Sequence, residues 1–152
     1  MPYEHPDVAA LEQAAQQFYV QIYGSPDETP FTTADFTPPH GAFLVGYLNE
    51  EAVAMGGWRF RTPGVPRVAR RPAEIRRMYV RECVRGRGFA RLVLAALEAS
   101  AAAAGADWML LETGQPQIAA VALYRSSGYV DVERFGHYAE SEMALNLGRP
   151  LL

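Results

Sequence analysis

Hydrophobic residues are distributed along the chain in two ways: at the spacing of an α-helix, and in short runs typical of strands. Apolar residues recur every three or four positions in residues 8–23, which predicts a helix with one buried face and Asp7 as its N-cap. Its expected core residues are Val8, Leu11, Ala15, Phe18 and Ile22. The alanine- and leucine-rich residues 90–104 predict a second helix that ends at Gly105. Its expected buried residues are Phe89, Leu92, Val93, Ala96 and Leu97.

Six further apolar runs have the length and composition of strands. They are residues 42–48, 51–60, 73–80, 107–113, 129–135 and 142–147. The first two are joined by the tight turn Asn49-Glu50 and should pair antiparallel, and Gly56-Gly57 in the second indicates a bulge or a close backbone approach. A third helix is predicted to begin at residues 114–116 and to end at residue 127. Residues 25–40 and 62–72 are predicted loops, the first with a helical turn near residues 33–36, and residues 1–6 are compatible with a short edge strand.

This order of elements predicts one α+β (mixed α/β) domain that comprises residues 1–152. The helix at residues 90–104 connects the strands at residues 73–80 and 107–113, so these two strands should be parallel, with a right-handed crossover. The composition is that of a globular domain, because 49% of the residues are hydrophobic and 20% are charged.

The sequence also limits the cellular compartments and the binding partners to be expected. The first residues lack a basic start followed by an apolar core, and no apolar run approaches the ~18–20 residues of a membrane span. We therefore expect a cytoplasmic protein without a membrane partner. Cys83 is the only cysteine, which allows no internal disulfide, and His5, His40 and His137 are too scattered to predict a metal site.

Charge is distributed unevenly along the chain. No lysine or arginine precedes Arg59, whereas eight acids do, and eleven arginines lie between Arg59 and Arg91. A basic middle suits a polyanionic cofactor and an acidic N-terminal third suits a cationic co-substrate, although most of the individual charges are better explained as solvated faces. The net charge of −3 and the lack of a basic stripe interleaved with aromatic residues argue against nucleic-acid binding.

The stretch Arg85-Gly86-Arg87-Gly88-Phe89-Ala90 lies between a predicted strand and a predicted helix. A glycine-rich turn at a helix start leaves backbone N–H groups unpaired at the positive end of the helix dipole, which makes it an anion site. Arginine side chains add positive charge, so a phosphate or pyrophosphate is the natural ligand. No Gly-Lys-Ser/Thr follows and a third glycine is missing, so neither a Walker loop nor a dinucleotide fingerprint fits. A surface turn with a solvated basic rim is the alternative.

Arg-x-x-Gly-x-Ala in this position resembles the pyrophosphate loop of the GNAT superfamily of acyl-CoA-dependent N-acyltransferases. Residues 117–124, followed by Gly128-Tyr129, resemble the family signature Asn-x-x-Ala-x-x-x-Tyr-x-x-x-Gly-Phe/Tyr, with Gln117 in place of the asparagine. The resemblance extends from about residue 43 to the C-terminus. It implies the GNAT fold: a mixed, largely antiparallel twisted sheet flanked by helices, whose parallel strands splay apart around the pantetheine arm of acyl-CoA.

The resemblance also implies acetyl-CoA as co-substrate and indicates where it binds. The pyrophosphate residues would be Arg85, Gly86, Arg87, Gly88, Phe89, Ala90 and Arg91. The pantetheine would bind the backbone of Met78, Tyr79 and Val80, with the Met78 N–H donating to the thioester carbonyl. Gln117 and Tyr124 would face the cofactor from one helical stripe, with Tyr124 as the general acid that protonates the leaving thiolate.

Glu74 is the predicted general base, because some GNAT histone acetyltransferases carry a base glutamate at this spacing, eleven residues before the loop. Glu74 and Met78 should lie roughly 13 Å apart along a strand, so a relaying water is expected between Glu74 and the amine. The structural alternative is an ion pair with an arginine such as Arg76 or Arg59. Glu112 and His137 are the other candidate bases.

These features predict an N-acetyltransferase that transfers an acetyl group from acetyl-CoA to a primary amine of a small molecule or protein, directly in a ternary complex. The amine is expected to be cationic, because Asp27, Glu28 and Asp35 lie in the loop that, by resemblance, borders the acceptor site. The sequence leaves open whether the protein forms a homodimer. The alternatives are a non-catalytic acyl-CoA-binding domain, a transferase for a different acyl group or acceptor, and a nucleotide-phosphate binder.

Overall fold

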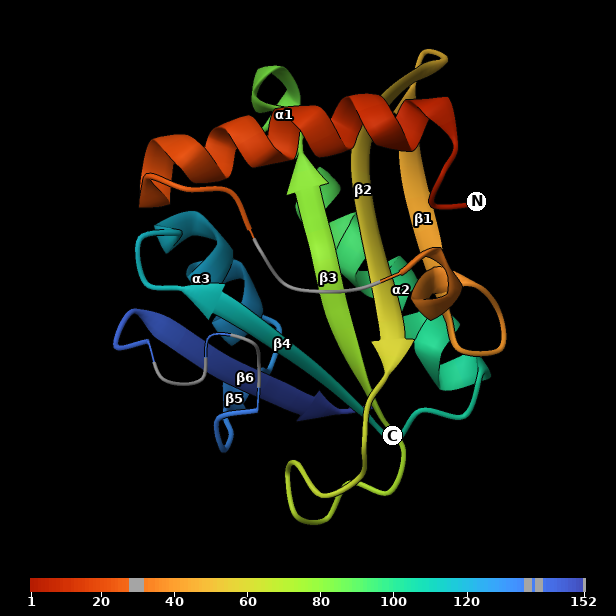
Figure 1. The fold of residues 1–152 in the computed structure, drawn as a ribbon, viewed down its shortest axis with the longest axis vertical. Coiled ribbons are helices and arrows are strands. Elements are labelled where there is room, and N and C mark those ends of the chain that lie inside the picture. Colours follow the sequence, from red (N-terminus) through yellow and green to blue (C-terminus); the bar gives the residue numbers. More distant parts are fainter. Residues whose placement is uncertain (28–31, 136–137, 139–140, 152) are drawn as a thin grey trace.

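A mixed β-sheet forms the centre of the molecule (Figure 1). The computed structural model describes residues 1–27, 32–135, 138 and 141–151. In these residues the sheet has six strands in the order β1-β2-β3-β4-β6-β5. The strands are β1 (Gly41–Leu48), β2 (Glu51–Phe60), β3 (Pro72–Val80), β4 (Trp108–Gly114), β5 (Val130–Asp131) and β6 (Ala144–Pro150). The helices are α1 (Pro6–Tyr23), α2 (Phe89–Ala103) and α3 (Ile118–Ser126), with short 3-10 helices η1 (Thr33–Phe36) and η2 (Glu82–Val84).

The parallel pair β3–β4 splays apart along its length. Residues 72–75 pair with residues 108–111 in parallel, whereas every other neighbouring pair in the described sheet is antiparallel. Beyond Ile75 and Leu111 the two strands continue without pairing to each other, and Figure 1 shows them diverging. The predicted fold class, a mixed sheet with a splayed parallel pair, is therefore confirmed.

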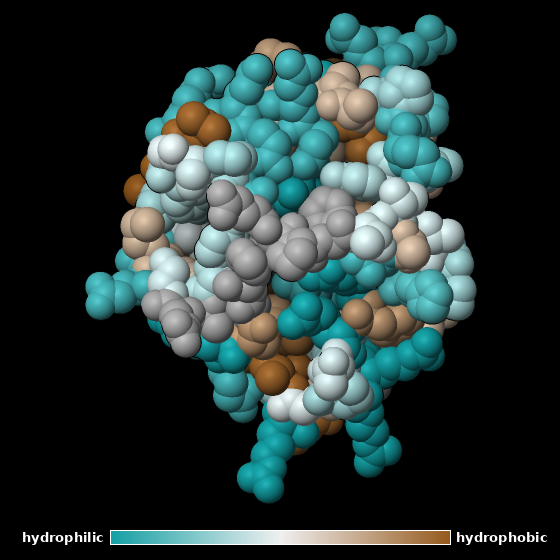
Figure 2. All heavy atoms as spheres, viewed as in Figure 1, coloured by the Kyte–Doolittle hydropathy of each residue, from teal (hydrophilic) through white to brown (hydrophobic). Residues whose placement is uncertain are grey.

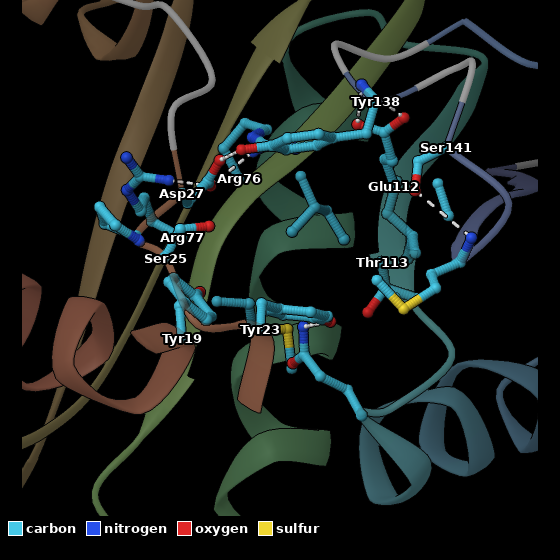
Figure 3. Close-up of a pocket in the computed structure, with 18 of the residues that line it drawn as sticks. Tyr19, Tyr23, Ser25, Asp27, Arg76, Arg77, Glu112, Thr113, Tyr138 and Ser141 are labelled. Carbon is cyan, nitrogen blue, oxygen red and sulfur yellow. Dashed lines mark hydrogen bonds and ion pairs between the residues drawn. The ribbon is translucent and has the colours of Figure 1, made fainter. Parts of the chain in front are cut away.

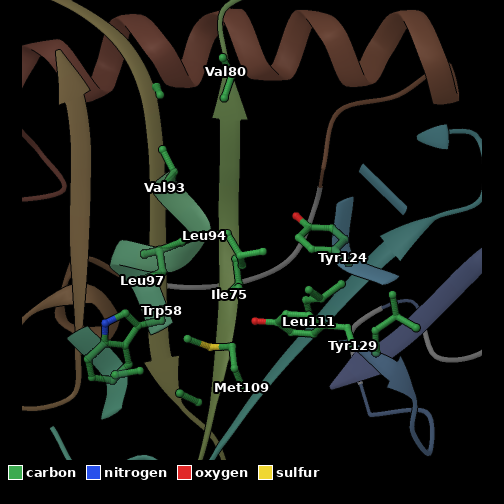
Figure 4. Packing of buried hydrophobic residues seen from close by; sticks show 14 of the residues in the cluster. Trp58, Ile75, Val80, Val93, Leu94, Leu97, Met109, Leu111, Tyr124 and Tyr129 are labelled. Carbon is green, nitrogen blue, oxygen red and sulfur yellow. The ribbon is translucent and has the colours of Figure 1, made fainter. Parts of the chain in front are cut away.

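Helices cover both faces of the sheet, α1 on the near face and α2 on the far face in Figure 1. Alternate residues of a strand point to opposite faces, so neighbouring residues of β2 enter different clusters. Met55 packs with Leu11 of α1 and Phe43, whereas Trp58 packs with Leu97 of α2 (Figure 4). The Trp58 Nε1–H donates to Ser100 Oγ at 2.9 Å, so this buried polar group is satisfied.

The face that carries α1 is mostly hydrophilic, and its hydrophobic side chains occur in small separate groups (Figure 2). Single exposed hydrophobic side chains are normal for a water-facing surface. Among the described helices, none has both the length and the apolar character needed to cross a membrane.

Two details of the predicted helices are wrong. The N-cap of α1 is His5, whose Nδ1 accepts from the Asp7 N–H at 3.1 Å, because Pro6 already suits the first helical position. In α2, Leu92 is 65% exposed and Ala96 is exposed as well. The buried stripe instead runs through Val93, Leu94, Leu97 and Ala101, so the predicted helical phase is partly displaced.

The predicted strands are wrong near both termini. The strand expected at residues 129–135 is only Val130–Asp131, because the Asn146 side chain accepts from the Phe135 N–H at 3.2 Å in place of a backbone carbonyl. The last strand is shifted to Ala144–Pro150, and residues 1–6 form no strand. The amino group of Met1 donates to the Phe43 carbonyl at 2.9 Å without a ladder. The third helix begins at Ile118, because β4 continues through Gly114.

Candidate active site

A cavity of about 300 Å³ lies where β3 and β4 diverge (Figure 3). Its walls are residues 75–78 of β3, residues 111–114 of β4, and Gln117 and Tyr124 at α3. The end of α1 and the chain after it close one side through Tyr19, Tyr23 and residues 25–27, and Tyr138, Ser141, Met143 and Ala144 close the other. The volume is at the lower end of those that hold small ligands in proteins.

A β-bulge lies in the wall that β3 provides. Met55 pairs with Tyr79 and Gly57 pairs with Arg76, so Arg77 and Met78 together oppose Gly56. Arg77 has a φ of 59°, a left-handed conformation that costs a non-glycine residue about 1–2 kcal/mol. The extra residue lies in β3, opposite Gly56, and not in β2, where Gly56-Gly57 indicated a bulge or a close approach. The backbone at Gly56 also lies close to α2, because a Cβ there would be 2.8 Å from Leu97 Cδ1.

Tyr124 and Met78, for which the sequence predicted separate contacts with the cofactor, both line this cavity. Tyr124 is 7% exposed, and its hydroxyl lies 3.6 Å from the Met78 sulfur. Burial raises the pKa of Tyr124 to about 12, against a smaller opposing effect of the Arg76 charge. The phenol therefore keeps its proton at physiological pH and is available as a donor.

Gln117 caps the start of α3 and contacts the end of α1. Its Nε2 donates to the Tyr23 hydroxyl at 2.8 Å. Burial raises the pKa of Tyr23, with the hydrogen bond from Gln117 acting in the opposite direction. A Cβ at Gly114 would lie 2.1 Å from the Tyr23 oxygen, so a side chain at position 114 would displace Tyr23. Tyr23 was not among the predicted site residues, since a tyrosine at a helix end carries no distinguishing signal.

The predicted pyrophosphate loop has an open backbone. Gly86 and Gly88 both have a φ of 83°, and a Cβ at either would meet nothing within 4 Å. Gly88 is the N-cap of α2, so the first N–H groups of a 15-residue helix follow it. Arg85 turns back, with Nε donating to the Val80 carbonyl at 3.0 Å and its guanidinium 4.7 Å from the Phe18 ring centroid. Arg91 contacts the hydroxyls of residues 126 and 127.

Glu74 lies at the paired end of β3 and outside the cavity. It is 1% exposed, and its carboxylate forms ion pairs with Arg59 at 3.3 Å, Arg61 at 3.6 Å and Arg76 at 3.7 Å. The structure therefore shows the ion-pair alternative that the sequence left open. It does not place Glu74 beside Met78 and Tyr124.

Glu112 is the acidic residue of β4 that lines the cavity. Both of its carboxylate oxygens lie 3.1 Å from the Tyr138 N–H. Burial raises the pKa of Glu112, and the hydrogen bond from Tyr138 partly offsets this effect. The other alternative base, His137, lies outside the described residues.

Two of the three acids expected to attract a cationic substrate, Asp27 and Asp35, form ion pairs within the protein. Asp27 forms ion pairs with Arg76 and Arg77 and accepts from the Tyr138 hydroxyl at 3.0 Å (Figure 3). Asp35 lies 3.0 Å from the Arg59 guanidinium. Glu28 lies outside the described residues. The described part of the chain contains no group of three His, Cys, Asp or Glu side chains that could hold a metal ion.

Comparisons with known proteins agree with this geometry. Residues 8–129 match the Acetyltransferase (GNAT) family, and the chain belongs to that family. It is 29% identical over 144 residues to the "IAA acetyltransferase" of Azospirillum brasilense, covering 95% of this chain and 90% of that protein.

Solved structures are similar along the whole chain. A Klebsiella pneumoniae protein that carries the name acyl-CoA N-acyltransferase superposes with a TM-score of 0.80 at 26% identity, covering 100% of this chain and 94% of the other. A GNAT-family acetyltransferase from Staphylococcus aureus superposes with a TM-score of 0.77 at 13% identity, covering 100% and 98%. The protein is therefore a GNAT acetyltransferase, a family whose members use an acyl-CoA as acyl donor.

Proposed function

We propose that the protein transfers the acetyl group of acetyl-CoA to a primary amine, directly in a ternary complex. One observation carries this proposal: the Tyr124 hydroxyl and the bulged backbone at Met78 meet in a single cavity. The strand that carries the bulge leads through η2 into the glycine loop, so cofactor loop and cavity are continuous along the chain.

The loop residues fit a pyrophosphate. Gly86 and Gly88 leave open space beside the backbone, and the N–H groups at the start of α2 favour an anion. Acetyl-CoA supplies the acetyl group as a thioester. Met78 lies in the bulge and has no register partner on β2 or β4, so its N–H is proposed as the donor to the thioester carbonyl.

Two side chains of the cavity would move the protons. A protonated amine first loses one proton to solvent and reacts as the neutral base. Its nitrogen then bonds to the carbonyl carbon and passes a further proton to Glu112, because a raised pKa makes a carboxylate a better base. The carbon–sulfur bond breaks, and Tyr124 donates its proton to the leaving thiolate. The proton on Glu112 returns to Tyr124 through solvent. This assignment replaces Glu74, whose carboxylate already neutralises arginines at the closed end of β3.

The acceptor is proposed to carry one positive charge and a mainly apolar or aromatic body. Tyr19, Tyr23, Tyr138, Met143 and Leu111 contribute much of the cavity wall. Arg76, Arg77 and Asp27 form ion pairs with protein groups, so they offer little net charge to a polycation. The "IAA acetyltransferase" relative supports acetyl transfer, and its name says nothing about the amine used here.

An amine panel with acetyl-CoA tests the proposal through the release of free CoA thiol. Aromatic monoamines should be turned over faster than polyamines and acidic amino acids. Acetyl-CoA binding by calorimetry, measured on the same protein, separates the alternatives. Binding without CoA release for any amine would favour a non-catalytic acyl-CoA-binding domain, and faster turnover of longer acyl-CoA donors would favour another acyl group.

A further inference from the structure

We propose that Arg77 is a positioning residue, and that a closed ring of Glu12, Gln16, Asp27 and Arg77, here called the Arg77 clamp, holds the bulge that presents the Met78 N–H. This inference rests on the proposed function, since that N–H is the carbonyl donor of the reaction. Glu12 and Gln16 of the clamp lie in α1, Asp27 follows α1, and Arg77 lies in β3. None of them belongs to the glycine loop or to the Tyr124 signature.

The Arg77 clamp is a continuous circuit of polar contacts. Arg77 Nε donates to Glu12 Oε1 at 2.8 Å, and the Gln16 amide donates to the same oxygen at 2.9 Å. The other end of the Gln16 side chain accepts from the Asp27 N–H at 2.8 Å. The Asp27 carboxylate closes the ring on Arg77 Nη1. Each member thus fixes the orientation of the next, and the bulge is tied to α1 by the Glu12 carboxylate and to the chain after α1 by the Asp27 carboxylate.

Arg77 sits where the backbone needs such support. With a φ of 59° it adopts a conformation that glycine enters freely and other residues rarely adopt. The other described non-glycine residues with positive φ, Asn49 and Glu50, lie in the exposed turn between β1 and β2. Strained conformations inside an element persist only when the surrounding structure holds them. The bulge borders the cavity, so this strain lies at the functional site.

The side chain of Arg77 is anchored firmly enough for this task. The residue is 7% exposed although its guanidinium is charged. Burial alone would lower the pKa of Arg77, but the carboxylates of Asp27 and Glu12 outweigh burial and the net shift is upward. Releasing Arg77 would let its backbone return to an extended φ. The extra residue would remain, but the path of the bulge would change and turn the Met78 N–H away from the thioester.

Two substitutions at one position separate backbone positioning from the loss of the ion pairs. Arg77→Gly and Arg77→Ala both remove the guanidinium, but only glycine adopts a φ near 59° without strain. We expect kcat to fall about 10²-fold in Arg77→Ala, the usual effect of losing one carbonyl donor. The kcat of Arg77→Gly should be at least ~5-fold higher than that of Arg77→Ala. The KM for acetyl-CoA should change less than ~3-fold in both. Equal kcat values in the two variants would show that Arg77 acts only through its ion pairs.

A double-mutant cycle keeps the test decisive if Arg77→Ala folds poorly, because it needs only Arg77→Gly. Glu12→Gln opens the clamp while Arg77 remains, and should lower kcat about 5–10-fold with KM unchanged. In the Arg77→Gly background the same substitution should change kcat less than ~2-fold. Additive losses would overturn the clamp.

Crystal structures of the two Arg77 variants give a readout without catalysis. A positive φ at residue 77 in the glycine variant and an extended φ in the alanine variant would support the clamp. A positive φ in both would contradict it. If the wild-type protein releases no CoA with any amine, the proposed function fails, and these structures still decide whether the clamp holds the bulge.

Discussion

The two ends of the β3–β4 pair are built from the same strands and differ in what they leave unpaired. At the closed end, residues 72–75 and 108–111 share a parallel ladder, and Glu74 meets three arginines. At the open end the ladder stops, Met78 lies in a bulge, and Glu112 faces a cavity. The closed end stabilises the fold, whereas the open end leaves backbone and side-chain groups available to a ligand.

The carboxylates of Glu74 and Glu112 show the same contrast at the level of one functional group. Glu74 is surrounded by guanidinium groups that neutralise its charge. The Glu112 carboxylate accepts a hydrogen bond from the backbone N–H of Tyr138, and burial raises the pKa of Glu112. Position along a splayed strand pair, more than residue type, therefore distinguishes a structural acid from a candidate base.

The largest expected effect lies where the open end of β3 leads into the glycine loop. Gly88→Glu adds a Cβ and a negative charge at the α2 N-terminus and should weaken acetyl-CoA binding at least ~100-fold in calorimetry. Gly64→Glu is the matched control, because Gly64 also has positive φ and open space but lies in the β2–β3 connection. Unchanged affinity in a folded Gly88→Glu protein would remove the loop from the cofactor site.

Tyr124→Phe tests the general acid at the open end. It removes only the hydroxyl, so kcat should fall about 10²–10⁴-fold while acetyl-CoA affinity changes little. Tyr129→Phe is the control, since the Tyr129 hydroxyl donates to Glu98 at 2.8 Å in the core. That control should cost stability, about 0.5–1.5 kcal/mol, and leave kcat unchanged. Full turnover of Tyr124→Phe at every pH would show that the thiolate leaves without this residue.

The contrast between the two ends also explains what the sequence could predict. Local patterns predicted the strand–loop–helix unit around Arg85 and Gly88 and the Tyr124 signature, because periodicity and glycine positions are local properties. The splay followed from the family resemblance. The choice between Glu74 and Glu112 was not local, because it depends on which arginines approach from other strands and loops.

The missed features have the same origin. Tyr23 reaches the cavity only because α1 ends beside Gly114, 91 positions later in the chain. The ion pairs of Asp27 with Arg76 and Arg77 span 49 and 50 positions of the chain, so a charge count predicted a cationic site where the described structure has ion pairs. Leu92 was wrongly predicted to face the core, because an alanine-rich helix such as α2 has several apolar stripes, any of which could be the buried one.

Glu112→Gln should lower kcat about 10²-fold and change the pH dependence. The base is active when deprotonated, and its pKa lies above the usual 4.5, so wild-type activity should fall as pH drops through the raised pKa. The variant should lack this acidic limb.

A raised carboxyl pKa contributes stability that is present at low pH and lost as pH rises through the folded-state value. Glu112→Gln should therefore melt higher than wild type at neutral pH, with a gap that narrows toward pH 4.5.

Glu74→Gln is the matched substitution at the closed end and should behave in the opposite way. Arg59 keeps Asp35 and Arg76 keeps Asp27, but a neutral amide replaces the buried carboxylate that three arginines share, so the free energy of unfolding should drop by about 1–3 kcal/mol. The folded variant should keep kcat within about 3-fold and retain the acidic limb of the pH profile. A loss of that limb in Glu74→Gln, with Glu112→Gln unaffected, would reverse the assignment of the base.

Asp35→Asn should have the smallest effect, because Asp35 lies away from the open end. Its side chain is 36% exposed, and its ion pair with Arg59 should contribute about 0.2–1 kcal/mol to stability at low salt. Arg59 keeps Glu74 as a partner, so the arginine is not left uncompensated. We expect kcat/KM for a cationic and a neutral amine to change less than ~2-fold in the variant, at low and at high salt. A selective, salt-sensitive loss of activity toward the cationic amine would show that the acidic N-terminal third does attract the acceptor, and that the charge pattern of the sequence is a better guide to the substrate than the ion pairs of the fold.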